Sequence, residues 1–192
     1  MDFDRLCGEN SDVVGWIYCK DTRINYPVVQ AENNDYYLYR GIDRNYSQFG
    51  SIFVEAGNRR DFADASTIIY GHHMRNGSMF AGLDLWNNQK YYDQHPYMWL
   101  LTPTQDYRVD ILSAYTTSAY SDTYQIFREP GPEFTAYLKA AVSRSSFRSR
   151  ATIQENGHYV LLSTCAYVFD EARYVVLGLL TPVNTAGGVP IS

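Results

Sequence analysis

Two apolar runs near the C-terminus decide the fold, Leu161-Leu162-Ser163-Thr164-Cys165 and Ala172-Arg173-Tyr174-Val175-Val176. Both are rich in apolar and β-branched side chains, so they predict two strands joined as a hairpin. Side chains on neighbouring strands can share one face of a sheet. The hairpin therefore carries a thiol, Cys165, and a permanent cation, Arg173, that the strand register can bring together.

The rest of the chain predicts more short strands and few helices. Residues 2–9 are predicted to form a short helix. A second helix is predicted to begin with Ser78 as its N-cap and to run through Trp86. Gly131-Pro132-Glu133 predicts the start of a third helix, inserted between Glu133 and Phe147. This pattern predicts a mainly β fold, a closed barrel of about eight strands, rather than a layered α/β fold. The predicted strands are Gly15–Cys19, Tyr26–Gln30, Ser51–Val54, Thr67–Gly71, Tyr97–Leu101, Tyr107–Tyr115, His158–Ser163 and Arg173–Leu180.

Length and charge limit the classes of protein. The 192 residues predict one domain over 1–183 and a flexible C-terminal tail over 184–192. A net charge of −5 without a basic run argues against a nucleic-acid partner. Eighteen tyrosines suit half-exposed strands and grooves that hold extended peptides or sugars. The chain as given has neither a membrane-length apolar run nor the basic start of a signal peptide.

The three cysteines, Cys7, Cys19 and Cys165, have no paired spacing, so a disulfide framework or zinc knuckle is disfavoured. A bridge between Cys7 and Cys19 stays a minor alternative. Because the number is odd, at least one thiol is free.

Cys165 can act as a nucleophile only as a thiolate, and an ordinary cysteine with a pKa of about 8.5 is mostly protonated at neutral pH. Arg173 can favour the thiolate or stabilise an oxyanion, but it cannot serve as a base. Proton transfer falls to a histidine, and His72 and His73 both follow an apolar strand. Adjacent strand residues face opposite sides, so only one of the two can share a pocket with Cys165, and a metal site on the pair is disfavoured.

Simpler interpretations stand beside this one. A cysteine within an apolar strand is more often a small core side chain, and a lone Arg173 is more often a surface charge. An L,D-transpeptidase would place an arginine two residues after the cysteine, where Tyr167 stands. A papain-like hydrolase would place its cysteine before its histidine, at a helix start.

Several ordered motifs together resemble a sortase, and most closely a class B sortase. They are Asn10 to Ile17, Ile24 to Gln30, Tyr70-Gly71-His72, and the strands that carry Cys165 and Arg173. The resemblance implies that residues 1–183 form a sortase catalytic domain. It also implies His72, Cys165 and Arg173 as catalytic residues, with no cofactor or metal.

The resemblance further implies a reaction. A sortase cleaves a C-terminal sorting motif of a secreted protein after threonine, here of the Asn-Pro-x-Thr-x or a related kind, through a thioester on the cysteine. It passes the acyl group to an amine of peptidoglycan or its lipid-linked precursor. Expected peptide contacts are Ser163, Thr164, Tyr120, Tyr124 and Ile126. The implied location is the extracellular face of the membrane of a Gram-positive bacterium, through an N-terminal signal-anchor absent from this chain.

Two alternatives stay open, a pilin-polymerising sortase and a noncatalytic peptide-binding β-barrel. The sequence departs from some class B members, in which an acid directly follows the cysteine and a longer loop precedes the arginine. Here Ala166-Tyr167-Val168-Phe169 follows Cys165, and the hairpin is shorter. A carboxylate that orients His72 is therefore unassigned, and the preference for the last motif residue is open.

Overall fold

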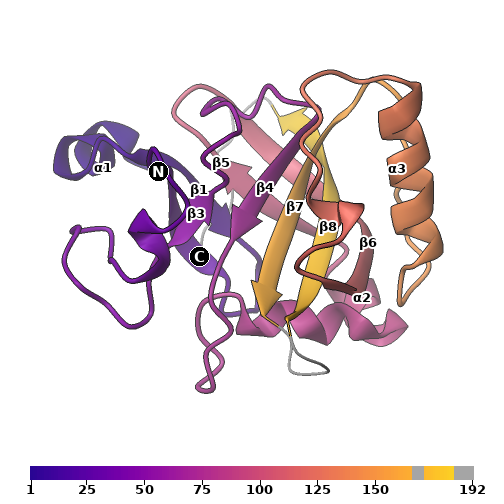
Figure 1. Cartoon of the computed structure of the whole chain (residues 1–192), viewed down its shortest axis with the longest axis horizontal. Coiled ribbons are helices and arrows are strands. Elements are labelled where there is room, and N and C mark those ends of the chain that lie inside the picture. The colour runs from indigo at the N-terminus through magenta and orange to yellow at the C-terminus, as the bar shows by residue number, and fades with distance from the viewer. Residues whose placement is uncertain (166–170, 184–192) are drawn as a thin grey trace.

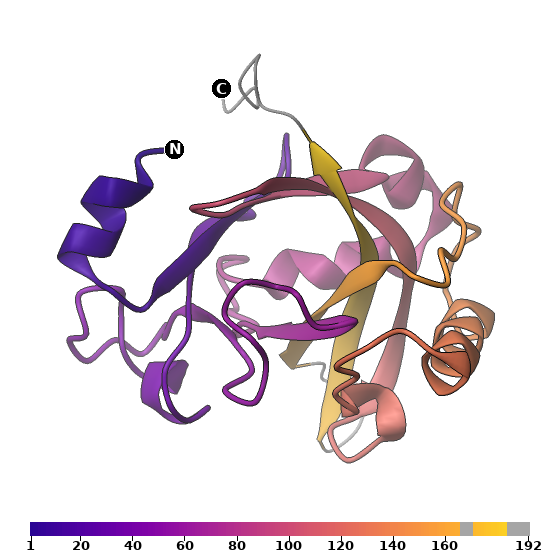
Figure 2. The ribbon, with the colours of Figure 1, turned by 90° about the horizontal axis from the view of Figure 1, so that it is seen from above.

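The computed structural model describes residues 1–165 and 171–183, and the side chain of Cys165 lies outside the described part. The predicted tail, 184–192, also lies outside it. Eight strands close into a barrel in the order β1-β2-β3-β4-β7-β8-β6-β5, which confirms the predicted fold class (Figures 1 and 2). The strands are β1 (Val13–Tyr18), β2 (Asn25–Val29), β3 (Ile52–Val54), β4 (Ser66–Tyr70), β5 (Tyr97–Leu101), β6 (Asp106–Ser118), β7 (His158–Cys165) and β8 (Ala172–Val183).

Two strand pairings place the site. β7 and β8 form the predicted antiparallel hairpin, and the register sets Cys165 opposite Arg173. β7 also pairs with β4 in parallel, from Ser66 opposite Tyr159 to Tyr70 opposite Ser163. Because β4 and β7 run in the same direction, the residues that follow Tyr70 lie at the same end of the barrel as Cys165.

The strand β7 reads as a continuous apolar run because both of its faces are buried. Val160 and Leu162 belong to the core inside the barrel, whereas Tyr159 and Leu161 belong to a second core on the outside. The helix α3 (Pro132–Ser143) covers that outer face through Phe134, Leu138 and Ala141, and Figure 1 shows it beside β6 and β8. Each large apolar side chain that is fully buried contributes about 1.5–3 kcal/mol. The helix inserted before β7 is thus confirmed.

The other helices are short. α1 (Phe3–Glu9) matches its prediction, and the side chain of Asp2 caps it by accepting a hydrogen bond from the Arg5 amide at 3.0 Å. The remaining helical elements are η1 (Tyr36–Leu38), η2 (Ala81–Asn87), α2 (Gln89–Gln94) and η3 (Asp122–Tyr124). Within the described ranges 1–165 and 171–183, no helix has the length and apolar character needed to cross a membrane.

The prediction that Ser78 caps a helix is wrong. The Ser78 hydroxyl and amide both donate to the side chain of Asn76, and the 3₁₀-helix that follows has Phe80 as its N-cap, with no side-chain cap hydrogen bond. Met79 then adopts a left-handed φ of 58°, which ends any helix started at Ser78, and the 3₁₀-helix η2 begins only at Ala81.

A buried carboxylate, Asp64, stabilises the connection between β3 and β4. It is fully buried and accepts hydrogen bonds from the Asn58 side chain, the Arg59 amide and the Arg128 guanidinium at 2.7–2.9 Å. Burial alone would raise the pKa of Asp64, but the hydrogen bonds from Asn58, Arg59 and Arg128 outweigh it and lower that pKa. The network stabilises the loop that leads into β4, the strand that His72 follows.

Cys7 and Cys19 are both free thiols, so the alternative of a bridge between them is wrong. Cys19 is buried beside the first strand, and its burial raises the pKa of the thiol to about 12. Cys19 is therefore an inert core residue at neutral pH.

Candidate active site

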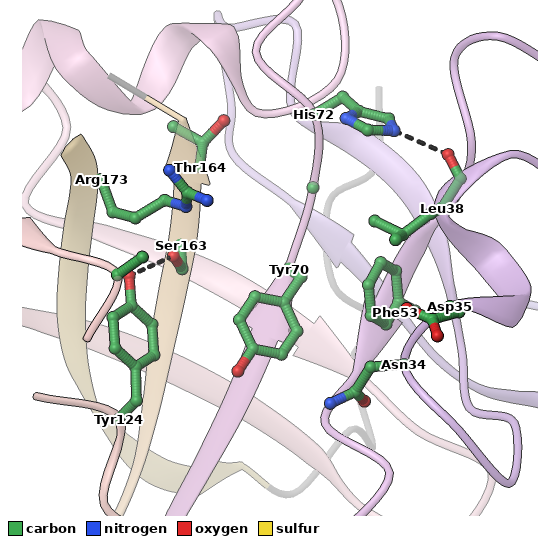
Figure 3. Close-up of a pocket in the computed structure, with 12 residues that line it drawn as sticks. Asn34, Asp35, Leu38, Phe53, Tyr70, His72, Tyr124, Ser163, Thr164 and Arg173 are labelled. Carbon is green, nitrogen blue, oxygen red and sulfur yellow. Dashed lines mark hydrogen bonds between the residues drawn. The ribbon is translucent and has the colours of Figure 1, made fainter. Parts of the chain in front are cut away.

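A cavity of about 330 Å³ opens where β4, β6 and β7 end and β8 begins (Figure 3). It brings together five of the predicted site residues with residues of the connection between β2 and β3. The lining residues are Asn34, Asp35, Leu38, Phe53, Tyr70, Gly71, His72, Ala119, Tyr124, Ser163, Thr164 and Arg173.

Arg173 supplies the positive charge of this cavity. Its side chain is 27% exposed, and its guanidinium donates to the Glu171 carboxylate and the Ala172 carbonyl at 3.1 and 3.0 Å. These contacts hold the guanidinium at the start of β8, where the backbone register sets it opposite Cys165. A guanidinium has five N–H donors, so an anchored Arg173 still has donors to offer a carbonyl oxygen.

His72 lies on the opposite side of the cavity from Arg173, directly after β4 (Figure 3). Its Nε2 is 2.6 Å from the carbonyl oxygen of Leu38, and its ring packs 5.8 Å from the ring of Tyr39. A carbonyl oxygen only accepts hydrogen bonds, so Nε2 carries the proton. In the neutral imidazole the lone pair is then on Nδ1, which is the atom that can exchange a proton with a substrate.

This hydrogen bond answers the question of what orients His72. The sequence assigned no carboxylate to it, and the structure shows that a backbone carbonyl has that place. The contact comes from η1, in the connection between β2 and β3, and no local sequence pattern near His72 could have pointed to it.

His73 faces away from the cavity. It lines a different cavity, where its Nε2 lies 3.0 Å from the carboxylate of Asp84. The two neighbouring histidines therefore belong to two sites, as the alternation of side chains predicts. In the described part of the chain, no three His, Cys, Asp or Glu side chains gather to hold a metal ion.

Ser163, Thr164 and Tyr124 lie beside Arg173. The hydroxyls of Ser163 and Tyr124 are 2.8 Å apart, which fixes both in the wall of the cavity. The Thr164 hydroxyl is buried and has no hydrogen-bond partner among the described residues. An unpaired buried hydroxyl at the edge of a cavity is a group that a bound peptide can satisfy.

The other two predicted contact residues lie outside the cavity lining. Tyr120 is 84% exposed and extends into solvent, whereas Ile126 is partly buried against the second core on the outside of the barrel. Sequence analysis also missed Asn34, Leu38 and Phe53. Asn34 and Leu38 belong to the connection between the parallel strands β2 and β3, and Phe53 belongs to β3 itself, so their place at the cavity depends on a long-range pairing without a local signal.

Comparison with known proteins gives the family. No family model matches the chain. The chain is similar to Sortase B of Listeria monocytogenes, with 34% identity over 175 residues that cover 89% of this chain and 70% of the relative.

Two solved structures of sortase B are also similar to this chain. The Staphylococcus aureus sortase B–substrate complex has a TM-score of 0.89 and 29% identity, covering 95% of this chain and 85% of that one. A sortase B complexed with triglycine has a TM-score of 0.88 and 30% identity, covering 95% and 86%. This chain therefore belongs to the class B sortases, and it is a sortase B-type cysteine transpeptidase.

Proposed function

We propose that this sortase cleaves a C-terminal sorting motif of the Asn-Pro-x-Thr-x kind, or a related proline-containing motif, after its threonine. The acyl group forms a thioester with Cys165 and passes to an amine of peptidoglycan or its lipid-linked precursor. One observation carries the proposal: Arg173 lines the same cavity as His72 and lies opposite Cys165 in the register of the hairpin. Proline in the motif lowers the entropy lost when an extended peptide enters such a cavity.

The residues divide the chemistry as follows. The Cys165 thiolate attacks the threonine carbonyl, and Arg173 stabilises the oxyanion that forms. The carbon–nitrogen bond breaks as His72, protonated on Nδ1, gives that proton to the leaving amine. In the second half of the reaction, neutral His72 accepts a proton from the incoming amine through Nδ1. That amine attacks the thioester, the carbon–sulfur bond breaks, and the thiolate returns.

The proposal includes a location. The enzyme acts at the extracellular face of a Gram-positive membrane, held by an N-terminal signal-anchor, and its clients are secreted proteins that carry the sorting motif. The acceptor amine is the point at which wall anchoring and pilin polymerisation differ. One structural neighbour is a sortase B complexed with triglycine, and this supports a peptide amine as the acceptor.

The test follows Asn-Pro-x-Thr-Gly and Ser-Pro-x-Thr-Gly peptides by mass spectrometry, with and without triglycine. We expect cleavage after threonine and a ligated product with triglycine, both abolished in Cys165→Ala. Cleavage that survives in Cys165→Ala would overturn the assigned nucleophile. If the wild-type chain leaves both peptides intact, the proposed motif is wrong.

A further inference from the structure

Glu55 lies just outside the cavity, directly after β3, and its backbone is firmly held. Its amide donates to the Ile68 carbonyl at 2.9 Å, and its own carbonyl accepts from the Asn58 amide and the Gln30 side chain at 2.9 and 3.0 Å. Gln30 is buried, so this anchor belongs to the rigid part of the barrel. The backbone of Glu55 therefore offers a fixed base for its side chain.

The Glu55 carboxylate joins two segments of the chain that line the cavity. Asn34, from the connection between β2 and β3, donates its side-chain N–H₂ to both carboxylate oxygens at 2.8 and 2.7 Å. Tyr70, the last residue of β4, donates its hydroxyl at 2.9 Å. The other end of the Asn34 amide accepts from the Ala56 backbone at 2.7 Å, so the amide has one orientation only.

Asn34 and Tyr70 line the cavity, whereas Glu55 does not. The Tyr70 ring packs against Phe53 at 5.3 Å and stacks on Tyr124 at 6.3 Å. Tyr124 in turn contacts the Ser163 hydroxyl, two residues before Cys165. Glu55 thus lies behind a continuous wall of the cavity, which reaches from the connection between β2 and β3 to the strand that carries Cys165. Figure 3 shows Asn34, Tyr70 and Tyr124 in a row along this wall.

The hydrogen bonds also have a fixed direction. Burial and the neighbouring Glu55 carboxylate raise the pKa of Tyr70, so its phenol keeps its proton and donates. Hydrogen bonds to an ionised acceptor are stronger than those between neutral groups. Without Glu55, the Asn34 amide and the Tyr70 hydroxyl would lose their shared acceptor and their relative position.

We propose that Glu55 is a positioning residue for the sorting peptide: its carboxylate fixes Asn34 and Tyr70 relative to each other as one preformed wall of the peptide site. The inference rests on the proposed function, because it concerns how that peptide is bound. Glu55 does not touch the reacting atoms. Its effect falls on peptide affinity and leaves the reactivity of Cys165 unchanged.

Two substitutions at position 55 disturb the positioning of Asn34 and Tyr70 in different ways. Glu55→Asp keeps the charge but withdraws the carboxylate by one methylene, so it cannot reach Asn34 and Tyr70 together. Glu55→Gln keeps the length, but its N–H₂ faces the Asn34 N–H₂, which donates to both carboxylate oxygens in the wild type at 2.8 and 2.7 Å. An amide N–H₂ accepts no hydrogen bond, so Asn34 and Tyr70 are left with a single acceptor oxygen. We expect Glu55→Asp to lower kcat/KM for the peptide about tenfold, equivalent to about 1.4 kcal/mol. Glu55→Gln should lower kcat/KM as well, because one of the two acceptor oxygens that hold Asn34 and Tyr70 is lost.

Three measurements test this. Cleavage kinetics give kcat and KM, titration of each variant in the Cys165→Ala background gives peptide affinity, and iodoacetamide alkylation reports the reactivity of Cys165. We expect Glu55→Asp to raise KM and weaken affinity by the same factor, with kcat and the alkylation rate unchanged. The matched control is Glu32→Ala, an exposed acid in the same connection as Asn34, which should match the wild type.

Two results would overturn the inference. One is wild-type peptide affinity in Glu55→Asp. The other is wild-type peptide affinity in Glu55→Gln, since the position of Asn34 and Tyr70 would then not depend on the two acceptor oxygens of Glu55. Both are read against wild-type cleavage, so they are distinct from a failure of the proposed function, in which the wild-type chain would cleave neither peptide.

Discussion

The hydrogen bond between His72 and the Leu38 carbonyl makes a test of proton transfer possible. In His72→Gln, the side-chain N–H₂ can still donate to that carbonyl, but no atom remains to exchange a proton. In His72→Ala both functions are lost. The two variants therefore separate the orienting contact from the chemistry.

The expected magnitudes follow from the geometry. Loss of general acid–base catalysis lowers kcat by about 10²–10⁴-fold, and both variants should show it. A neutral hydrogen bond contributes about 1 kcal/mol, which only His72→Ala loses. For a domain of this size that difference lowers Tm by about 2–4 °C.

The assays are peptide cleavage, thermal unfolding and ¹⁵N NMR of the imidazole. Neutral His72 should show its proton on Nε2. His73→Gln is the matched control, because His73 lies in a different cavity, and its kcat should equal that of the wild type. A kcat within tenfold of the wild type in His72→Gln, or a neutral ring with its proton on Nδ1, would refute the reasoning.

Three further predictions concern Arg173, Tyr124 and Asp64. Arg173→Lys keeps the charge but loses the planar set of donors, so kcat should fall about 10²-fold or more with peptide affinity nearly unchanged, as seen in single-turnover kinetics. Tyr124→Phe leaves the buried Ser163 hydroxyl without this partner, and urea unfolding should show a loss of about 1–2 kcal/mol. Asp64→Asn weakens the contact with the half-exposed Arg128 and should cost about 2 kcal/mol at pH 7. Because the folded pKa of Asp64 is lowered, its contribution is complete above the unfolded pKa of about 3.9 and is lost as pH falls further. The difference between wild type and Asp64→Asn should therefore shrink in urea titrations at pH 3, and a constant difference would contradict the assignment.

The sequence predicted the barrel well because its signals are local. All eight strands lie within a few residues of their predicted bounds, since each apolar run is continuous and turns separate the runs. The 3₁₀ and helical region after β4 was the weak point. There, the left-handed backbone of Met79 prevents a helix from beginning at Ser78, so η2 begins later in the chain. The helix α2 has no apolar stripe from which the sequence could have predicted it.

Some residues of the candidate site could be predicted from local sequence motifs, and others could not. The place of His72 and Arg173 at the cavity could be predicted because His72 belongs to a motif at the end of β4 and Arg173 to one at the start of β8. Asn34, Leu38 and Glu55 could not, because their relation to the site depends on the parallel pairing of β2 with β3 and on a loop between them. The orienting group of His72 is a main-chain oxygen, and side-chain patterns carry no information about such a group.

The parallel pairing of β4 with β7 has a consequence for folding. Cys165 and Arg173 are close in sequence and meet on one hairpin, but His72 reaches them only when segments about ninety residues apart pair, as Ser66 does with Tyr159. Contacts between such distant segments generally form late. Under the proposed mechanism, a chain that has formed only the hairpin therefore holds a nucleophile and a cation but no proton carrier. Catalytic turnover, unlike thiol reactivity, then reports that the whole barrel has assembled, and a nascent chain gains the enzyme's activity only at that final step.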